Sequence, residues 1–466
     1  MAAKKIPRRE FVRRTMAGAA SAAALSTAAP PSVAPASDAH ARPADVRQPN
    51  LLFILADDLG WGDLSCYGRP DYRTPNLDRL ASEGVRLTHA YSASPVCTPT
   101  RCAFATGRYP ARTPVGLEEP LAWKKQLVER KRDVGLAPEH PTVASLLKAV
   151  GYRTALVGKW HLGYLPKYSP VKSGYDEFYG IMSGGATFFS HKDANDEPDF
   201  FEGEVAVEHT GYMTELLTER AVSYLSRRDD ARPFYLSLHY NAPHWPWEGP
   251  NDAAGASRPR LGYGGMTAGG SLKTYAEMMR SLDEGVGRVM RALRERGLER
   301  DTLVVFTSDN GGERFSYNWP FRGAKFELYE GGIRVPAIVR WPGVVPAAKT
   351  SAQVAVTMDW TATLVAAGGA RPAPTHPFDG VDLLPVLSGA RAPFERTLFW
   401  RHAGTAAALA GVWKYLRLDE KTERLFDLSA DEREQADFAS SRPELLAALR
   451  DKYRAWESQM LKLGDK

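Results

Sequence analysis

The run from Cys97 to Arg108 combines a nucleophilic side chain with a fixed cation at a predicted helix start. Thr98 is a favourable N-cap, Pro99 suits the first helical position, and Gly107 can end the helix. Free N–H groups at a helix start favour negative charge, and Arg101 adds a cation one turn further on. A nucleophile at position 97 would be held as an anion beside a site suited to a tetrahedral oxyanion. The alternative is a small buried cysteine.

Oxygen ligands follow two predicted strands. The strands at 51–55 and 302–307 run into acidic and amide side chains, which are Asp57, Asp58, Asp309 and Asn310. Three carboxylates and one amide suit a hard divalent cation, and the lack of His or Cys in both clusters argues against zinc. Calcium is favoured over magnesium, because a cage of protein oxygens fits its looser geometry. One Asp pair alone would indicate a turn or helix cap, but two clusters at two strand ends favour a metal site.

Basic and titratable side chains follow three further segments. Lys159 and His161 come after one predicted strand, two positions apart in an extended segment, so they share a face. His244 follows another strand in a proline-bounded loop, whereas His239 lies within that strand and is expected to be structural. Lys325 belongs to a Gly-punctuated segment too polar for a core, and we expect it to face a cleft. Such a site would bind a tetrahedral anionic group and stabilise charge on a leaving oxygen.

Strand and helix patterns alternate along the chain. Apolar runs predict strands at 51–55, 153–157, 234–239 and 302–307, and helices are predicted at 142–150, 213–227 and 272–296. This alternation predicts an α/β fold with a large, mostly parallel sheet covered by helices on both faces. Ligands of such sheets lie beyond the carboxyl ends of the strands, which is where the reactive side chains occur.

The pattern changes from about residue 378. Short strands are predicted at 397–402, 411–418 and 423–428, followed by a final helix at 443–461. We therefore expect a catalytic domain over residues 42–377 and a smaller C-terminal α+β domain over 378–466, with an antiparallel sheet and a terminal helix.

The first 41 residues have the features of a signal peptide. A basic start precedes an Ala-rich stretch and the small-x-small sequence Ala39-His40-Ala41, and the pair Arg8-Arg9 resembles a twin-arginine export signal. The apolar run is too short and weak to span a bilayer, so no membrane span is expected in the mature chain. We predict export by the twin-arginine machinery to the periplasm or the outside. The alternative is an ordinary secretory signal.

The basic charge belongs mainly to this leader. The formal net charge of the chain is +5, and removing residues 1–41 leaves about +1 by the same count. The sequence thus gives no reason to expect nucleic acid or an anionic membrane as a partner. The three cysteines give no disulfide framework, and at most one bridge could form, between Cys66 and Cys102 if Cys97 is engaged elsewhere.

Two stretches of the chain resemble the signatures of type I sulfatases, which belong to the alkaline phosphatase superfamily. Cys97-Thr98-Pro99-Thr100-Arg101, continued through Thr106-Gly107-Arg108, is similar to the first signature. Gly151-Tyr152-Arg153-Thr154, continuing to Gly158-Lys159-Trp160-His161, is similar to the second. The resemblance extends from about residue 50 to the C-terminus and leans toward arylsulfatases and N-acetylgalactosamine-6-sulfatases.

The resemblance implies that a formylglycine-generating enzyme converts Cys97 to formylglycine, reading the Cys-x-Pro-x-Arg segment in the unfolded chain. The aldehyde hydrate, bound to calcium, would attack sulfur and release the alcohol, and its second hydroxyl would allow sulfate to be eliminated. The implied metal ligands are Asp57, Asp58, Cys97, Asp309 and Asn310.

The resemblance also implies roles for the remaining site residues. Arg101 and Lys159 would hold the hydrate and the sulfate oxygens, and His161 would be the base for elimination. His244 and Lys325 would bind sulfate, and one of the two would protonate the leaving alcohol.

The expected substrate is a sulfated carbohydrate in nature, with aryl sulfates as substrates in vitro. Residues 184–201 and 245–263 are candidates for lining the substrate site, the first range through Phe188, Phe189, His191 and Lys192. Two alternatives stay open. One is a phosphomonoester or phosphonate monoester hydrolase with the same nucleophile, and the other is a non-catalytic sulfoglycan-binding protein with an intact thiol.

Overall fold

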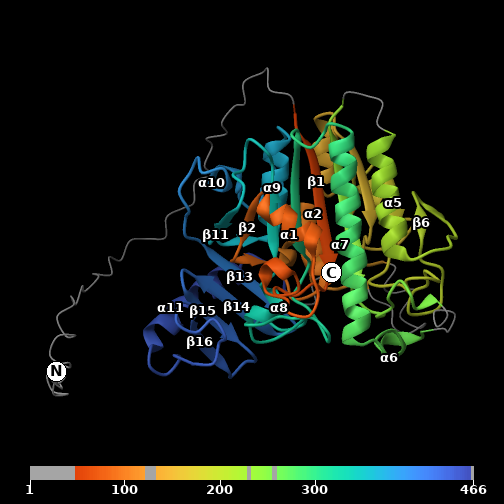
Figure 1. Cartoon of the computed structure of the whole chain (residues 1–466). Helices are drawn as coiled ribbons and strands as arrows, with labels where there is room; N and C mark the ends of the chain where they lie inside the picture. Colours follow the sequence, from red (N-terminus) through yellow and green to blue (C-terminus); the bar gives the residue numbers. More distant parts are fainter. Residues whose placement is uncertain (1–47, 121–132, 228–231, 254–259, 463–466) are drawn as a thin grey trace, which may run out of the picture. The chain divides into compact units, whose positions relative to one another are not determined.

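A ten-stranded sheet occupies the centre of the structure, a computed structural model that describes residues 48–120, 133–227, 232–253 and 260–462 (Figure 1). The strand order is β11-β2-β10-β9-β1-β8-β4-β5-β6-β7. The strands are β1 (Asn50–Asp57), β2 (Val85–Leu87), β4 (Arg153–Gly158), β5 (Glu177–Gly180), β6 (Phe201–Glu202), β7 (Val205–Ala206), β8 (Phe234–Pro243), β9 (Thr302–Ser308), β10 (Ala337–Arg340) and β11 (Lys349–Ser351). The predicted leader, residues 1–41, lies outside the described residues.

The middle of the sheet is parallel and its edges are mixed. Strands β9, β1, β8, β4 and β5 pair in parallel, whereas β10 pairs with β9 and β2 in antiparallel fashion and β6 does so with β5 and β7. The short strands β3 (Ala90–Tyr91) and β12 (Ala355–Val356) form a separate parallel pair. The predicted mostly parallel sheet is confirmed, and the antiparallel edge strands are an addition to it.

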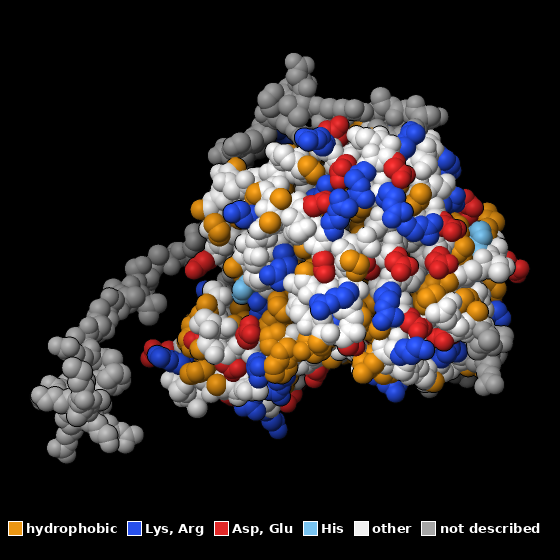
Figure 2. Space-filling model, in the orientation of Figure 1, with side chains coloured by type: hydrophobic (Ala, Val, Ile, Leu, Met, Phe, Trp, Pro, Cys, Tyr) orange, Lys and Arg blue, Asp and Glu red, His pale blue; other side chains and the backbone are white. Residues whose placement is uncertain are grey.

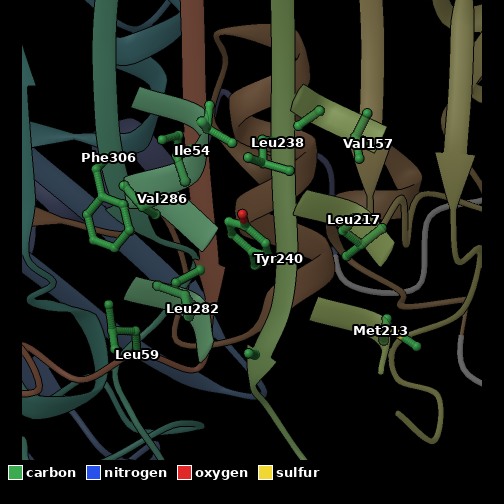
Figure 3. Packing of buried hydrophobic residues seen from close by; sticks show 14 of the residues in the cluster. Ile54, Leu59, Val157, Met213, Leu217, Leu238, Tyr240, Leu282, Val286 and Phe306 are labelled. Atoms are coloured by element: carbon green, nitrogen blue, oxygen red, sulfur yellow. The ribbon is translucent and has the colours of Figure 1, made fainter. Parts of the chain in front are cut away.

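Two long helices cover one face of the sheet (Figure 3). Ile54 pairs with Leu238 on one side and with Phe306 on the other, so these three side chains form a row across the sheet. Leu282 and Val286 of α7 (Leu272–Glu295) pack with this row, and α5 (Met213–Ser226) lies beside α7. The helix α1 (Pro75–Ser82) belongs to the same layer. The buried residues of α7 recur at helical spacing, as they do on one face of an amphipathic helix.

The other face carries the helix that begins at Cys97. This face is covered by α2 (Cys97–Thr106), α4 (Val143–Ala149) and α9 (Thr357–Ala367). Phe53 of β1 stacks on Phe104 of α2 with ring centroids 3.8 Å apart. Because strand side chains alternate between faces, β1 holds α2 with one face while its other face supports α7.

A four-stranded antiparallel sheet and a terminal helix form the C-terminal part (Figure 1). Its elements are β13 (Thr397–His402), β14 (Thr405–Ala410), β15 (Trp413–Arg417), β16 (Glu423–Asp427) and α11 (Pro443–Glu457). Strand β14 was missed by the sequence reading, because Ala-rich segments have low strand propensity. Pairing on both sides, and packing around Trp400, Tyr415 and Tyr453, make it a strand here. The predicted terminal helix is confirmed but ends at residue 457.

Three features of the described residues bear on export and partners. Each of the three cysteines is free, so the possible bridge between Cys66 and Cys102 is absent. Among the described helices, none is both long and apolar enough to cross a bilayer. On the face shown in Figure 2, Lys and Arg side chains are interspersed with Asp and Glu.

Candidate active site

The predicted site residues meet at the ends of four neighbouring strands. Strands β9, β1, β8 and β4 are consecutive in the sheet. The side chains that end or follow them are Asp57 on β1, Asp58, Lys159 and His161, His244, Asp309 and Asn310. The alignment of parallel strand ends therefore brings together groups that lie up to 252 residues apart, as their hydrogen bonds show.

Helix α2 places Cys97 against the acidic residues. Cys97 is the first residue of the helix, and its Sγ lies 3.3 Å from Asp57 Oδ1 and 3.9 Å from Asp58 Oδ1. Gly107 ends the helix in the left-handed conformation, as predicted. The prediction of Thr98 as N-cap is wrong. Val96 holds that position, and the Thr98 hydroxyl instead donates to the carbonyl oxygen of His161 at 3.1 Å.

The donor atoms of the site fit a divalent cation. Ligand atoms of Asp57, Asp58, Cys97 and His244 all lie within 4.8 Å of one another, and all four residues are buried. The amide nitrogen of Asn310 donates to Asp58 Oδ1 at 2.7 Å, while Asn310 Oδ1 is buried and has no hydrogen-bond partner among the described residues. Because buried polar atoms are rarely left without a partner, this amide oxygen beside the carboxylates could serve as a ligand to a cation.

Three buried cations surround the carboxylates. Arg101 donates Nε and Nη2 to Asp309 Oδ2 at 3.0 and 2.8 Å. Lys159 Nζ donates to Asp57 Oδ2 at 2.6 Å, and Lys325 Nζ donates to Asp58 Oδ2 at 2.8 Å. Each of these three cationic side chains thus contacts at least one predicted metal ligand. These positive groups are already removed from water, so an anionic ligand would bind them without the cost of desolvating them.

Burial and neighbouring charges set the protonation of the acidic groups. Burial, with Asp309 close by, raises the pKa of Asp57 to about 7. Burial would also raise the pKa of Asp309, but Arg101 and Lys159 outweigh it and hold that pKa at about 2. Burial, together with Asp309 and Asp57, raises the pKa of the Cys97 thiol well above its usual value. The helix start alone suggested an anion at position 97, whereas burial and the two carboxylates act in the opposite direction on this thiol.

Two neutral histidines face the site. Burial and the charge of Lys159 lower the pKa of His161, and burial with Lys325 lowers that of His244. Among the described residues, neither ring nitrogen of His161 has a hydrogen-bond partner, whereas His244 Nδ1 lies 2.5 Å from the Trp245 carbonyl oxygen. His161 is therefore free to exchange a proton with a ligand.

The segment between Lys159 and His161 is less extended than predicted. Strand β4 ends at Gly158, and His161 has a φ of 53°, in the left-handed region. Gly158 has a φ of 117° and lies so close to the His239 carbonyl that a Cβ there would be 1.8 Å from its oxygen. His239 itself contacts Ser237 and the Lys159 carbonyl, which agrees with the structural role predicted for it.

A cavity of about 130 Å³ opens next to Cys97. It is lined by Val96, Cys97, Glu119, His161, Gly184, His244, Trp245, Tyr263, Lys325 and Phe326. Of the residues in the predicted lining ranges, Gly184, Trp245 and Tyr263 line this cavity. The prediction of Phe188 as lining is wrong, because its ring packs in the core against Tyr212. Glu119 was not predicted, since nothing in its local sequence indicates which way it points.

Asp199, which sequence reasoning also missed, holds the segment that contains Gly184. Its buried carboxylate accepts hydrogen bonds from the backbone N–H groups of Met182 and Ser183 at 3.0 and 3.1 Å. A Cβ at Gly185 would lie 2.9 Å from the His244 ring, so this segment packs closely against the site.

A mostly parallel sheet with carboxylates, imidazoles and buried cationic side chains at its strand ends is suited to hydrolysing esters of tetrahedral oxyacids. The family model described as Sulfatase matches residues 49–370, and the chain belongs to this family. It is therefore a sulfuric ester hydrolase, with the fold of sulfatases in the alkaline phosphatase superfamily.

Individual relatives agree with this assignment. The chain is 34% identical over 380 residues to N-acetylgalactosamine-6-sulfatase of Canis lupus familiaris, an alignment covering 78% of this chain and 70% of the relative. It is 34% identical over 428 residues to steryl-sulfatase of Mus musculus, covering 74% of this chain and 65% of the relative. The crystal structure of Ps i-CgsB superposes with a TM-score of 0.79 at 31% identity, covering 88% of this chain and 93% of that one.

Proposed function

We propose that this sulfatase binds calcium, uses formylglycine made from Cys97, and acts in nature on a sulfated carbohydrate. The observation that carries the proposal is the position of Cys97, whose Sγ lies in a buried site against Asp57 and Asp58. A thiol that took up the sulfuryl group would hold it as a thiosulfate-like adduct with no easy exit, whereas an aldehyde hydrate has a second hydroxyl group that allows sulfate to be eliminated.

The proposed metal ligands are the three carboxylates, the orphaned amide oxygen and residue 97. They belong to Asp57, Asp58, Asp309, Asn310 and Cys97. Asp57, Asp58 and Cys97 have ligand atoms within 4.8 Å of one another and of His244, while Asp309 and Asn310 adjoin this group through hydrogen bonds with Asp58. All of these donors except residue 97 are oxygens of the protein, which favours calcium over magnesium. When bound, calcium would balance the carboxylate charges and attract the sulfate oxygens.

Calcium is expected to raise the melting temperature of protein first treated with a chelator. Binding to the folded state alone stabilises by about 2.7 kcal/mol at a ligand concentration 100 times Kd. Thermal unfolding with added calcium or magnesium measures the effect. Asp309→Asn should lose the calcium shift, whereas Asp199→Asn, which changes a buried carboxylate outside the ligand set, should keep it. An equal shift with magnesium would contradict the preference for calcium.

The remaining residues take roles that fit their contacts. Arg101 and Lys159 would orient residue 97 and the sulfate oxygens, since both lie among the metal ligands. His161 would accept a proton through an unpartnered ring nitrogen when sulfate leaves. Lys325 and His244 would bind sulfate, and one of them would protonate the leaving alcohol. Both lie near Asp58 Oδ2, at 2.8 and 3.6 Å.

Aromatic side chains in the cavity are compatible with a carbohydrate substrate. Trp245, Tyr263 and Phe326 line the cavity, and the last two are half-exposed. Such rings suit the apolar face of a sugar and an aryl group equally well. A second structure of the similar Ps i-CgsB, at 30% identity to this chain, was solved in complex with k-i-k-neocarrahexaose. Aryl sulfates are the expected substrates in vitro.

Comparing three aryl esters tests the proposed reaction. The purified protein should turn over an aryl sulfate much faster than the matching aryl phosphate or phosphonate. A faster phosphate or phosphonate reaction would favour the alternative hydrolase. The phosphonate monoester hydrolase of Agrobacterium radiobacter shares the fold, with a TM-score of 0.61 at 19% identity. Binding of sulfated oligosaccharide without turnover of any ester would instead indicate a sulfoglycan-binding protein.

The proposal extends to maturation, export and domain division. A formylglycine-generating enzyme would modify Cys97, and residues 1–41 would direct export by the twin-arginine machinery to the periplasm or the outside. Residues 42–377 would form the catalytic domain and 378–466 the C-terminal domain. The basic start, the Ala-rich stretch and the small-x-small sequence support the leader. N-terminal sequencing of the exported protein would test the cleavage.

A further inference from the structure

Lys325 is carried by a closed loop. Residues 322–331, which we call the Lys325 loop, are closed at the base by a hydrogen bond from Gly331 N–H to the Arg322 carbonyl oxygen at 2.7 Å. Lys325 lies within this loop, reaches Asp58 and lines the cavity. Its own N–H donates to the Gly312 carbonyl at 3.1 Å. The position of the Lys325 ammonium group therefore depends on how the loop is held.

Glu434 of the C-terminal part contacts the loop at both ends. Arg322 Nη1 donates to the Glu434 carbonyl oxygen at 3.3 Å. At the other end, the Glu330 N–H donates to Glu434 Oε2 at 2.6 Å. Glu434 has a φ of 56°, a left-handed conformation that costs a residue other than glycine about 1 kcal/mol or more. This conformation lets one residue present its carbonyl and its carboxylate to the two ends of the loop.

Lys414 of β15 joins the two glutamates. Its Nζ lies 2.9 Å from Glu330 Oε1 and 2.8 Å from Glu434 Oε1, and all three side chains are fully buried. We call these three residues the Lys414 cluster. Glu330, at the start of the short helix α8 (Glu330–Ile333), is also paired with Arg334 and accepts the hydroxyl hydrogen of Tyr91 at 2.8 Å. Figure 1 shows α8 beside the C-terminal sheet.

A buried ion cluster is a poor source of stability. The cost of desolvating the charges offsets most of their attraction, and well-packed apolar side chains often stabilise as much or more. What the charges do provide is one defined geometry, because each carboxylate oxygen needs its partner at hydrogen-bond distance. Here that geometry fixes both ends of the loop that carries Lys325.

We propose that the Lys414 cluster positions Lys325 for sulfate binding, so that the C-terminal part acts on the active site through Lys414 and Glu434. Glu330, Lys414 and Glu434 are positioning residues, which act only through the loop. The inference rests on the proposed function, because that function gives Lys325 its place in sulfate binding.

A double-mutant cycle with an aryl sulfate tests the coupling. Lys414→Met should lower kcat/KM by about tenfold to a hundredfold at a temperature well below its melting temperature, as small misplacements of catalytic groups do. In the Lys325→Ala background the same change should alter kcat/KM by less than about twofold, because the two residues act as one unit. Losses that simply add, or an unchanged Lys414→Met variant, would overturn the proposal.

A second variant keeps the test valid if Lys414→Met does not fold. Glu434→Gly suits the left-handed backbone and keeps the carbonyl that Arg322 contacts, but it removes the carboxylate. It should show the same non-additive loss. Arg450→Met is the matched control, since Arg450 pairs with Glu423 within the C-terminal part. It should leave kcat/KM within about twofold of wild type, as expected for a site uncoupled from the loop.

Amide hydrogen exchange separates this inference from the proposed function. Peptides covering residues 322–331 should exchange faster in Lys414→Met and Glu434→Gly than in wild type or Arg450→Met. This readout does not need turnover. If the wild-type protein lacked aryl sulfatase activity but the exchange difference was present, the proposed function would be wrong, while the coupling between the Lys414 cluster and the Lys325 loop would stand. An active wild type with no exchange difference would reject the inference alone.

Discussion

Cys97→Ala is expected to abolish aryl sulfate turnover, with a fall in kcat of at least about 10⁵-fold, the scale seen when a nucleophile is removed. The side chain at position 97 lies against Asp57 and Asp58 and lines the cavity beside His161 and His244. Alanine removes the one side chain that lies against both acids and that would accept the sulfuryl group in the proposed reaction. Steady-state kinetics of purified variants measures the loss.

Cys102→Ala is the matched control for this substitution. Cys102 lies in the same helix and is fully buried, but its Sγ contacts Thr113 rather than the acidic cluster. Its loss should lower stability slightly and leave kcat nearly unchanged. Mass spectrometry of the wild-type peptide with residue 97 should show a loss of roughly 18 Da, as expected for exchanging a thiol for an aldehyde. Full activity with an unshifted peptide would contradict the proposed nucleophile.

Arg101→Met is expected to remove both activity and a large part of the stability. Arg101 is 1% exposed, and its guanidinium pairs with Asp309 while also lying 3.6 Å from Asp57. Removing one partner of a buried pair leaves an uncompensated charge, which costs about 3–5 kcal/mol. Urea unfolding measures the stability, and kcat/KM measures the loss of sulfate binding.

Arg396→Met separates the two effects. Arg396 pairs with the fully buried Asp359 at 2.6 Å, away from the cavity. Its loss should also destabilise the protein, but kcat/KM for the folded protein should stay close to wild type. If Arg101→Met lost stability and kept its activity, Arg101 would be a structural residue only.

The sequence predicted most of the site because the relevant chemistry lies directly after buried strands. Asp57, Lys159, His244 and Asp309 each end or follow an apolar run, and parallel strands align their carboxyl ends. No knowledge of the loops was needed to expect them together. The antiparallel edge strands were not predicted, since β10 and β2 are short and their direction depends on connections the pattern does not encode.

Residues that act from loops could not be predicted in the same way. Glu119, Asp199 and Glu434 have ordinary neighbours in the sequence, and only tertiary contacts give them their places. Phe188 shows the opposite error, because an aromatic residue in a polar segment is also a good core residue. The raised pKa of the Cys97 thiol also depends on tertiary contacts. The surrounding carboxylates outweigh the helix start, and their proximity is a property of the fold.

The position of β9 far along the chain has a consequence for biosynthesis. The fold that buries Cys97 needs β9, which ends at Ser308, roughly 210 residues after Cys97. At 5–20 residues per second this takes roughly 10–40 s. Throughout that interval the nascent chain lacks β9 and cannot enclose the cysteine as the finished fold does. The order of the strands would thus give the proposed modifying enzyme time to act before the thiol becomes inaccessible.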